Sequence, residues 1–237
     1  MDQATQNLTE HSRENAFVHP DARRGRGTVT NRAGRYERQR LTNADDGWDN
    51  LDKEPEVLRT QVLRDTTRGI LSRNQSPDIP FDRSINPYRG CEHGCVYCFA
   101  RPTHAFLGLS AGLDFETKIF VKPDAANLLE TELRKPNYRP QVIAMGTNTD
   151  PYQPLEKERK ITRSILEVLA RFKHPVSILT KSNLVTRDLD ILGPMAEQGL
   201  AKVSLSITTL DHRLARSMEP RASTPGRRLD AIKKLKA

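Results

Sequence analysis

Three cysteines, Cys91, Cys95 and Cys98, have the residue type and the spacing best suited to chemistry. They are the only cysteines among 237 residues, and they follow the pattern C-x3-C-x2-C beside Gly90 and Gly94. Three thiolates on one short loop can hold three corners of a 4Fe-4S cluster and leave the fourth iron open to an external ligand. The two glycines permit the tight, partly left-handed backbone that such wrapping demands. The sequence therefore predicts a catalytic cluster.

Other interpretations of the cysteines stay open. His93 could complete a four-ligand zinc site, although zinc ligands usually come as two pairs separated by about a dozen residues. The alternative function is therefore a zinc-stabilised nucleic-acid-binding protein without catalysis. A third interpretation is an iron–sulfur protein that only carries electrons. Three ordinary buried thiols are not expected at this spacing.

The residues around this loop predict alternating strands and helices from residue 81 onward. Short β-branched runs alternate with amphipathic stretches at the spacing of βα units. Continuous apolar runs, such as residues 176–179, indicate a parallel sheet covered by helices. The predicted strands are residues 84–88, 118–121, 141–146, 176–180 and 202–208.

Four amphipathic helices are predicted between and after these strands. Asp124 caps the first, Thr186 opens the third, and Thr224 caps the fourth, with Pro225 at its first position. A further short helix is expected at 57–72, before a turn with two prolines. The apolar residues expected to face inward are, helix by helix, Ala125, Leu128, Leu129 and Leu133; Ile161, Ile165, Leu169 and Phe172; Leu189, Leu192 and Met195; and Leu229, Ile232 and Leu235.

Such a series closes into a barrel or opens into a doubly wound sheet, and both gather sites at the carboxyl ends of the strands. Polar clusters at 148–150, 181–182 and 208–209 are expected at that edge. A complete eight-unit barrel takes about 250 residues, whereas 157 remain after residue 80 (237 minus 80). The predicted fold class is α/β, a partial (β/α) barrel over 81–237 that is truncated at its C-terminus.

The sequence before this barrel is divided into an N-terminal tail and a helical lead-in with its turn, at 1–55 and 56–80. In the tail, residues 23–40 hold seven arginines and one acid, and residues 45–56 hold six acids and one base. Neither block has apolar periodicity, so the tail is expected to be disordered. The arginines predict either a basic arm for nucleic acid or a solvated tail that folds back on the acidic block.

The whole sequence carries a formal net charge of +8 and has no apolar run long enough for a membrane span. Its first residues lack the basic-then-apolar pattern of a signal peptide. Reduced thiols that bind metal are typical of the cytosol. A cytoplasmic protein without membrane contact is therefore expected.

The residues around the cysteines resemble the radical S-adenosylmethionine superfamily, because an aromatic residue, Tyr97, stands just before the third cysteine of a loop that follows a first strand. Five stretches, in this order, are similar to its spore photoproduct lyase-like branch, a mostly uncharacterised bacterial subgroup. The resemblance runs from about residue 63 to the end. The stretches are PYRGCEHGCVYCFARPTH, FVKPDAANLLETEL, GTNTDPYQPLEKERKITRSILEVL, SILTKSNLVTRDLDIL, and SITTLD with EPRASTP.

The resemblance implies a 4Fe-4S cluster and S-adenosylmethionine as cofactors. In that superfamily the open iron chelates the methionyl amino and carboxylate groups, and one electron breaks the sulfonium bond. A 5′-deoxyadenosyl radical then takes hydrogen from the substrate, while the protein positions the cofactor and excludes water. The expected partners are a one-electron reductant, such as flavodoxin or ferredoxin, and a substrate for which nucleic acid is the leading candidate.

The resemblance also implies candidate contacts to S-adenosylmethionine at the strand ends. Each has a structural alternative: packing, an Asx turn, a solvated lysine, a serine bonded to backbone, or a surface ion pair between Glu219 and Arg221. The candidates are Tyr97 beside the adenine, Asn148 and Asp150 for the methionyl amino group, Lys181 and Ser182 near the carboxylate, Ser206 for a ribose hydroxyl, and Glu219 and Arg221 for cofactor or substrate.

The sequence departs from the spore photoproduct lyases proper at one position that matters for the reaction. Spore photoproduct lyases proper use an additional cysteine near the position of Asn148 to return hydrogen to the product, and this sequence has no fourth cysteine. Thymine-dimer repair is therefore not expected, and a tyrosine such as Tyr152, or further chain, would have to supply the hydrogen. His104 and His174 have no evident partner and are expected at helix caps or on the surface.

Overall fold

A computed structural model of the chain describes residues 17–34, 36 and 57–236. Its larger sheet has five strands in the order β2 (Leu71–Arg73), β3 (Arg83–Ile85), β6 (Ile143–Met145), β7 (Val176–Thr180) and β8 (Ala201–Leu205). The last four are parallel, and β2 is antiparallel to β3 at the edge. Helices connect the parallel strands, as the sequence predicts, and the α/β partial barrel is confirmed.

A second, three-stranded sheet adjoins the first. β1 (Gln61–Arg64) pairs in parallel with β5 (Lys118–Val121), and β4 (Tyr88–Arg89) pairs antiparallel with β5. Only Asn86 and Pro87 separate β3 from β4, so the single strand predicted here is divided between the two sheets. The cysteine loop begins directly after β4.

The other predicted strands are found at or near their expected places. β5 and β7 match to the residue, whereas the strands predicted at 141–146 and 202–208 are shorter. The helix predicted at 57–72 is wrong, because this stretch contains β1 and β2. Val62 and Leu71 pack against the core from these strands, so pairing with β5 and β3 overrides local helical preference.

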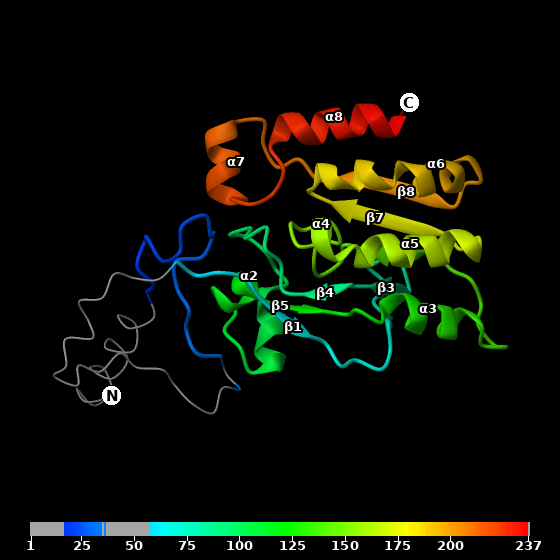
Figure 1. The fold of residues 1–237 in the computed structure, drawn as a ribbon, viewed down its shortest axis with the longest axis horizontal. Coiled ribbons are helices and arrows are strands. Elements are labelled where there is room, and N and C mark those ends of the chain that lie inside the picture. The colour runs from blue at the N-terminus through cyan, green and yellow to red at the C-terminus, as the bar shows by residue number, and fades with distance from the viewer. Residues whose placement is uncertain (1–16, 35, 37–56, 237) are drawn as a thin grey trace.

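Four longer helices cover the strands in chain order: α3 (Ala125–Leu133), α5 (Ile161–Arg171), α6 (Leu189–Glu197) and α8 (Pro225–Lys236) (Figure 1). α3 packs against α5, and α5 packs against α6. This layer fixes the carboxyl ends of the strands, where the cysteine loop lies. Core residues from helices and strands include Leu129, Ile143, Ile165, Ile178 and Leu192.

Shorter helical turns occupy the connections. They are η2 (Arg101–Leu107), α2 (Asp114–Thr117), α4 (Glu156–Arg159), η3 (Asn183–Asp188) and α7 (His212–Met218). The third predicted helix begins after Thr186, because η3 precedes α6. Asp124 stands at the N-cap of α3 without capping it, since its carboxylate accepts a hydrogen bond from Arg64 at 2.7 Å.

Helix α8 faces the protein only in part as predicted, since Leu235 packs against the core as expected. Leu229 and Ile232, expected to face inward, are 41% and 40% exposed, while Arg228 and Ala231 are buried. Arg228 can be buried because its guanidinium donates to Glu219 and to two backbone carbonyl groups. A buried ion pair therefore decides which side of α8 packs inward.

The N-terminal segment 17–34 is folded against the rest of the protein, so the expectation of disorder is wrong for these residues. Phe17 and Thr30 form an antiparallel bridge, and the backbone N–H of Leu58 donates to Ala22. In Figure 1 this segment, in blue, runs beside α2. The acidic block 45–56 lies outside the described residues, as does most of 35–40.

Among the helices of the described part of the chain, none combines the length and the apolar character that a membrane crossing requires.

Candidate active site

The three cysteines lie on the loop after β4 and open into one cavity of about 150 Å³. Cys91 is buried, while Cys95 and Cys98 are partly exposed, and all three are free thiols. Gly90 and Gly94 adopt left-handed backbone with φ of 82° and 66°, which confirms the conformational role expected of them. The loop therefore curls and directs three sulfur atoms toward a common space.

The thiols are held in a poorly solvated position. Burial, and then the carboxylate of Asp150, raise the pKa of the Cys91 thiol. Burial, and then the carboxylate of Glu219, raise the pKa of the Cys95 thiol to about 12. Such thiols become thiolates when a metal displaces their protons. In a 4Fe-4S cluster each cysteine binds a different iron, so three cysteines that line one cavity fit such a cluster.

The back of the loop is held by a buried carboxylate, Glu116 of α2. It accepts hydrogen bonds from the backbone N–H groups of Gly27 and Thr28 at 2.9 and 3.0 Å, and from Arg101 at 2.6 Å. Arg101 also donates to the carbonyl oxygen of Cys95 at 2.9 Å. The segment 17–34 is thereby tied to Cys95 through two charged side chains, Glu116 and Arg101.

Close backbone contact reinforces this attachment. A Cβ added to Gly27 would lie 1.8 Å from the carbonyl oxygen of Gly94, so only glycine fits there. Arg26, next to it, is buried and donates to the carbonyl oxygen of Glu116 at 2.8 Å and to Thr60 at 3.0 Å. Thr60 donates in turn to Glu92 at 2.6 Å, within the cysteine loop.

The front of the loop is held by Gln153, which sequence reasoning did not select. Its side-chain oxygen accepts from the N–H of Glu92 at 2.9 Å, and its nitrogen donates to the carbonyl oxygen of Gly90 at 3.3 Å. The two contacts lie on either side of Cys91. Gln153 belongs to the GTNTDPYQP stretch after β6, so that stretch binds the backbone of the cysteine loop.

Asp150, a predicted cofactor contact, lines the cysteine cavity but already has several partners. Its oxygens accept from the hydroxyl of Thr180 and the N–H of Lys181, both at 2.7 Å, and from the N–H of Tyr152 at 2.9 Å in an Asx turn. Burial alone would raise its pKa, but His93 and these hydrogen bonds outweigh burial and hold the pKa below its ordinary value. Nδ1 of His93 lies 3.3 Å from this carboxylate without the alignment of a hydrogen bond.

Lys181, Tyr97, Ser206 and Glu219 come together as one cluster of side chains. The ammonium group of Lys181 donates to Ser206 at 2.9 Å, lies 3.9 Å from Glu219, and sits 5.8 Å from the centre of the Tyr97 ring. The Tyr97 hydroxyl donates to Glu219. Burial, and then Glu219, raise the pKa of Tyr97, so its phenol keeps its proton. Four of the predicted cofactor residues are thus in mutual contact.

Glu219 and Arg221 do not form the surface ion pair that was the structural alternative. Glu219 is buried and accepts from Arg228 at 2.5 Å and from Thr208 at 2.6 Å. Burial raises its pKa, but these bonds outweigh burial and lower it. Arg221 instead pairs with Glu92 at 3.3 Å. Thr208 belongs to the polar cluster expected at 208–209, whereas Arg228 gave no recognisable signal in the sequence.

Other candidates have different positions. Ser182 accepts from the N–H of Leu184 and caps η3, outside the residues that line the cysteine cavity. Asn148 lines the cavity with an exposed side chain, while its N–H donates to Asn86 at 3.1 Å. Tyr152 is fully buried and donates to Asp188 at 3.0 Å, so it cannot return hydrogen to a substrate radical.

The two histidines without an expected partner are not at helix caps or on the surface. His104 is fully buried, with Nε2 3.0 Å from the carbonyl oxygen of Lys118. His174 is also buried; its Nδ1 lies 3.0 Å from the carbonyl oxygen of Pro175, and its Nε2 lies 2.7 Å from the Tyr138 hydroxyl. Burial lowers the pKa of both imidazoles.

Known proteins resemble the chain in sequence and in fold. A family model described as the radical SAM superfamily matches residues 85–237. An uncharacterised protein of Mycobacterium tuberculosis is 43% identical over 159 residues, 67% of this chain and 47% of that protein. An uncharacterised protein of Methanocaldococcus jannaschii is 32% identical over 151 residues, 64% of this chain and 54% of that protein. The chain thus spans about half the length of these relatives.

A likeness in fold extends to solved structures. Spore photoproduct lyase complexed with dinucleoside spore photoproduct aligns with a TM-score of 0.50 and 17% identity, over 74% of this chain and 47% of that chain. The family model covers well over half of the sequence and includes the whole cysteine loop. The chain therefore belongs to the radical SAM superfamily, and its cofactors are a 4Fe-4S cluster and S-adenosylmethionine.

Proposed function

We propose that this chain forms the catalytic core of an enzyme that cleaves S-adenosylmethionine reductively and uses the product to abstract hydrogen from a substrate. The observation that carries the proposal is the shared cavity of Cys91, Cys95 and Cys98, which Lys181 and Tyr97 also line. When bound, the reduced cluster and S-adenosylmethionine supply one electron and a 5′-deoxyadenosyl radical. The chain's own residues hold the cofactor and keep water from it.

Three side chains in that cavity are proposed to touch S-adenosylmethionine. The ammonium group of Lys181 offers a point charge to the methionyl carboxylate. Asn148 offers an acceptor oxygen to the amino group, and the half-exposed Tyr97 ring offers a flat surface to the adenine. All three line the cavity of the cysteines.

The remaining candidates are proposed as positioning residues. Asp150 is occupied by Thr180, Tyr152 and the N–H of Lys181, so it fixes the end of β7. Ser206 and Glu219 hold the ammonium group of Lys181. Ser182 caps the turn after β7, and Arg221 pairs with Glu92 of the cysteine loop.

For the substrate we propose nucleic acid, supported by the formal net charge of +8 and by the fold shared with a lyase complexed with dinucleoside spore photoproduct. A lyase-type reaction is proposed on the same resemblance. Because the chain has no fourth cysteine and Tyr152 is buried, Tyr97 is the tyrosine that could return hydrogen within this cavity. The electron donor would be a flavodoxin or ferredoxin.

The experiment is anaerobic reconstitution with iron and sulfide, followed by dithionite and S-adenosylmethionine, with 5′-deoxyadenosine measured by mass spectrometry. The wild type should form the nucleoside, and Cys95→Ala should reduce it to background, since that variant loses a cluster ligand. Val96→Ala, a change on the same loop, should retain activity. Wild-type amounts of nucleoside from Cys95→Ala would refute the ligand assignment.

The same preparation distinguishes the alternative functions. Colourless protein with one tightly held zinc and no iron would support a zinc-stabilised nucleic-acid-binding protein. Brown protein that neither binds S-adenosylmethionine nor forms 5′-deoxyadenosine would support an electron carrier. About four irons per chain together with nucleoside formation supports the enzyme.

A further inference from the structure

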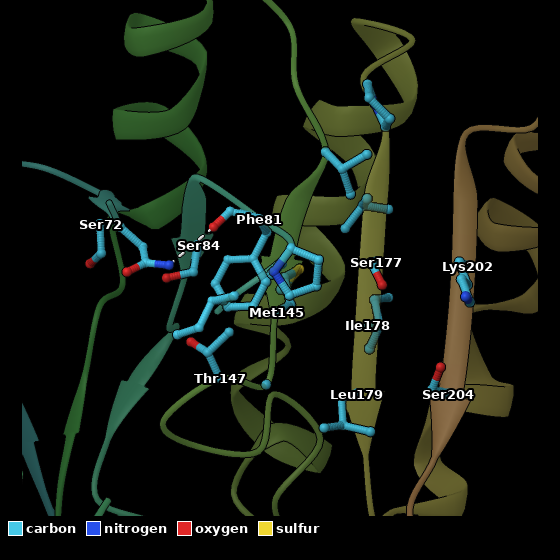
Figure 2. Close-up of a pocket in the computed structure, with 18 of the residues that line it drawn as sticks. Ser72, Phe81, Ser84, Met145, Thr147, Ser177, Ile178, Leu179, Lys202 and Ser204 are labelled. Atoms are coloured by element: carbon cyan, nitrogen blue, oxygen red, sulfur yellow. Dashed lines mark hydrogen bonds between the residues drawn. The ribbon is translucent and has the colours of Figure 1, made fainter. Parts of the chain in front are cut away.

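A cavity of about 870 Å³ lies against the inner face of the five-stranded sheet (Figure 2). One register row crosses all five strands on this face: Ser72 pairs with Ser84, Ser84 with Ala144, Ala144 with Ser177, and Ser177 with Lys202. Figure 2 shows the labelled members of this row in line, from β2 to β8. All five residues line the cavity.

The small side chains of this row leave a space that bulky side chains fill in most (β/α) barrels. In a packed (β/α) barrel the inward layers consist mainly of bulky Val, Ile and Leu. Here three serines and an alanine take those places, whereas Ile85, Met145 and Ile178, one residue further along their strands, are buried. Apolar residues such as Val142 and Leu179 also line the cavity, so the small side chains are a feature of this one row.

The row also presents unused polar groups. Within the described residues, the hydroxyl groups of Ser72, Ser84 and Ser177 make no hydrogen bond, and the ammonium group of Lys202 makes no ion pair. None of the described residues that line the cavity is Asp or Glu, and Arg73 is its second cation. Hydroxyl groups and an unpaired cation without a neighbouring carboxylate suit a ligand that is polar and negatively charged.

The other end of the cavity reaches the cofactor site. Phe99, Gly146, Thr147, Asn148 and Leu179 line both this cavity and the cavity of the three cysteines. Phe99 follows the last cysteine and is 79% exposed, so it presents a bare aromatic ring at the junction. A ligand that reaches from Lys202 to Phe99 would have one end beside the cofactors.

We propose that this cavity binds the substrate, and that the substrate carries an oxyanion, a phosphate or a carboxylate, which Lys202 binds at the end away from the cofactors. The serine hydroxyls hydrogen-bond to the polar body of the substrate, and Phe99 contacts its reacting end. The inference rests on the proposed function only in expecting the radical near Phe99; the oxyanion site itself depends on the serine row and Lys202.

Lys202 could instead serve to prevent association between sheets, and this role differs from oxyanion binding in its consequences. In the described part of the chain β8 pairs only with β7, so it is an edge strand, and lysine on an edge strand can prevent sheet-to-sheet association. That role predicts self-association of Lys202→Ala without any change in ligand binding. Sedimentation of the variant measures self-association directly.

The experiment measures binding of two matched ligand pairs to the whole reconstituted chain in the presence of S-adenosylmethionine, by isothermal titration. One pair is uridine 5′-monophosphate and uridine, and the other is N-acetylphenylalanine and its amide. At least one oxyanion should bind about tenfold more tightly than its neutral partner. Lys202→Ala should abolish that preference, whereas Lys202→Arg should retain it. Lys234→Ala, which removes an exposed lysine from α8, is the charge-matched control and should behave as the wild type.

Two further readouts make each outcome decisive. Ser177→Leu should weaken both members of the preferred pair, because it fills the cavity, while its affinity for S-adenosylmethionine stays unchanged. Equal binding within both pairs, or a preference that survives in Lys202→Ala, overturns the oxyanion site. Formation of 5′-deoxyadenosine in the same preparations tests the proposed function separately, since a chain that forms the nucleoside without any oxyanion preference refutes only this inference.

Discussion

Lys181 is fixed at both its backbone and its ammonium group by carboxylates that stay charged inside the protein. Asp150 accepts from its N–H at 2.7 Å, and Glu219 lies 3.9 Å from its Nζ, which also donates to Ser206. The pKa of each of these two carboxyl groups is lowered, because hydrogen bonds outweigh the effect of burial. An ammonium group held in this way loses little freedom when an anionic ligand arrives, so it is well prepared to bind a carboxylate.

We expect Lys181→Ala to weaken S-adenosylmethionine binding about tenfold, the equivalent of one charge-assisted hydrogen bond. Iron content should not change, because Lys181 holds no backbone group of the cysteine loop. Equilibrium dialysis with the reconstituted protein measures the dissociation constant. Lys157→Ala, at an exposed lysine of α4, is the control, and an unchanged affinity in Lys181→Ala would remove this residue from the cofactor site.

His174 gives the protein a pH-dependent stability. Burial lowers its pKa, whereas in the unfolded chain the imidazole titrates near its ordinary value of about 6.5. As pH falls below that value the unfolded state takes up a proton that the folded state does not, so the free energy of unfolding decreases. Urea unfolding at pH 7.5 and 5.5 should show a smaller decrease for His174→Gln than for the wild type. The exposed His212→Gln should match the wild type; a decrease in His174→Gln equal to that of the wild type would contradict this role.

At the scale of elements, the N-terminal segment 17–34 is a support for the cysteine loop. Its Arg26 is buried among backbone carbonyl groups and Thr60, its Gly27 touches Gly94, and its N–H groups satisfy Glu116. Buried polar groups that lose a partner are costly, so these contacts favour the attached arrangement. The segment thereby links the part of the chain before the barrel to Cys95 of the cysteine loop.

Removing the Arg26 side chain should therefore affect both stability and the cluster. Arg26→Ala leaves the carbonyl oxygens of Glu116 and Leu58 without the hydrogen bonds that Arg26 donates to them. This change should lower the free energy of unfolding by about 2–3 kcal/mol. Iron should also be lost to a chelator several-fold faster. Arg24→Ala removes an exposed arginine of the same segment and should change stability by less than about 0.5 kcal/mol. Equal iron loss from the two variants would show that the segment does not support the loop.

The sequence predicted some elements well, and the reasons differ from element to element. β7 was found to the residue, because a run that begins Val-Ser-Ile-Leu favours a strand; burial nevertheless alternates along it, with Val176 and Ile178 buried and Leu179 48% exposed. A helix was predicted at 57–72, where β1 and the start of β2 lie, because these short strands form only by pairing with β5 and β3. The side of α8 that faces inward depends on an ion pair between Arg228 and Glu219, which no periodicity reveals.

Some residues of the candidate site could be predicted from the sequence, and others could not. The cysteines and Lys181 stand at strand ends in recognisable motifs, and the structure places them around one cavity. Gln153, Glu116 and Arg101 act through hydrogen bonds to backbone groups that are distant in the sequence or carry no pattern of their own. Such contacts become visible only once the chain is folded.

At the scale of the whole molecule, two adjoining cavities organise the function. The smaller one collects the cysteines and the proposed cofactor contacts, and the larger one extends along a row of small side chains to Lys202. The described residues make a five-stranded sheet and an adjoining three-stranded sheet. The larger cavity lies against the face of the five-stranded sheet that bears the row of small side chains, and it shares lining residues with the smaller one. We therefore propose that the cofactors bind beside the cysteine loop and that the substrate binds along the adjoining face of the five-stranded sheet.

We propose that the three cysteines hold a cluster whose fourth iron is free to bind S-adenosylmethionine. Electron paramagnetic resonance of the dithionite-reduced, reconstituted chain measures this directly, with and without S-adenosylmethionine. We expect one reduced 4Fe-4S signal per chain that changes shape when S-adenosylmethionine is added, and no such signal from Cys95→Ala. A wild-type spectrum that lacks the cluster signal, or that is identical with and without S-adenosylmethionine, would show that the cysteines do not hold such a cluster.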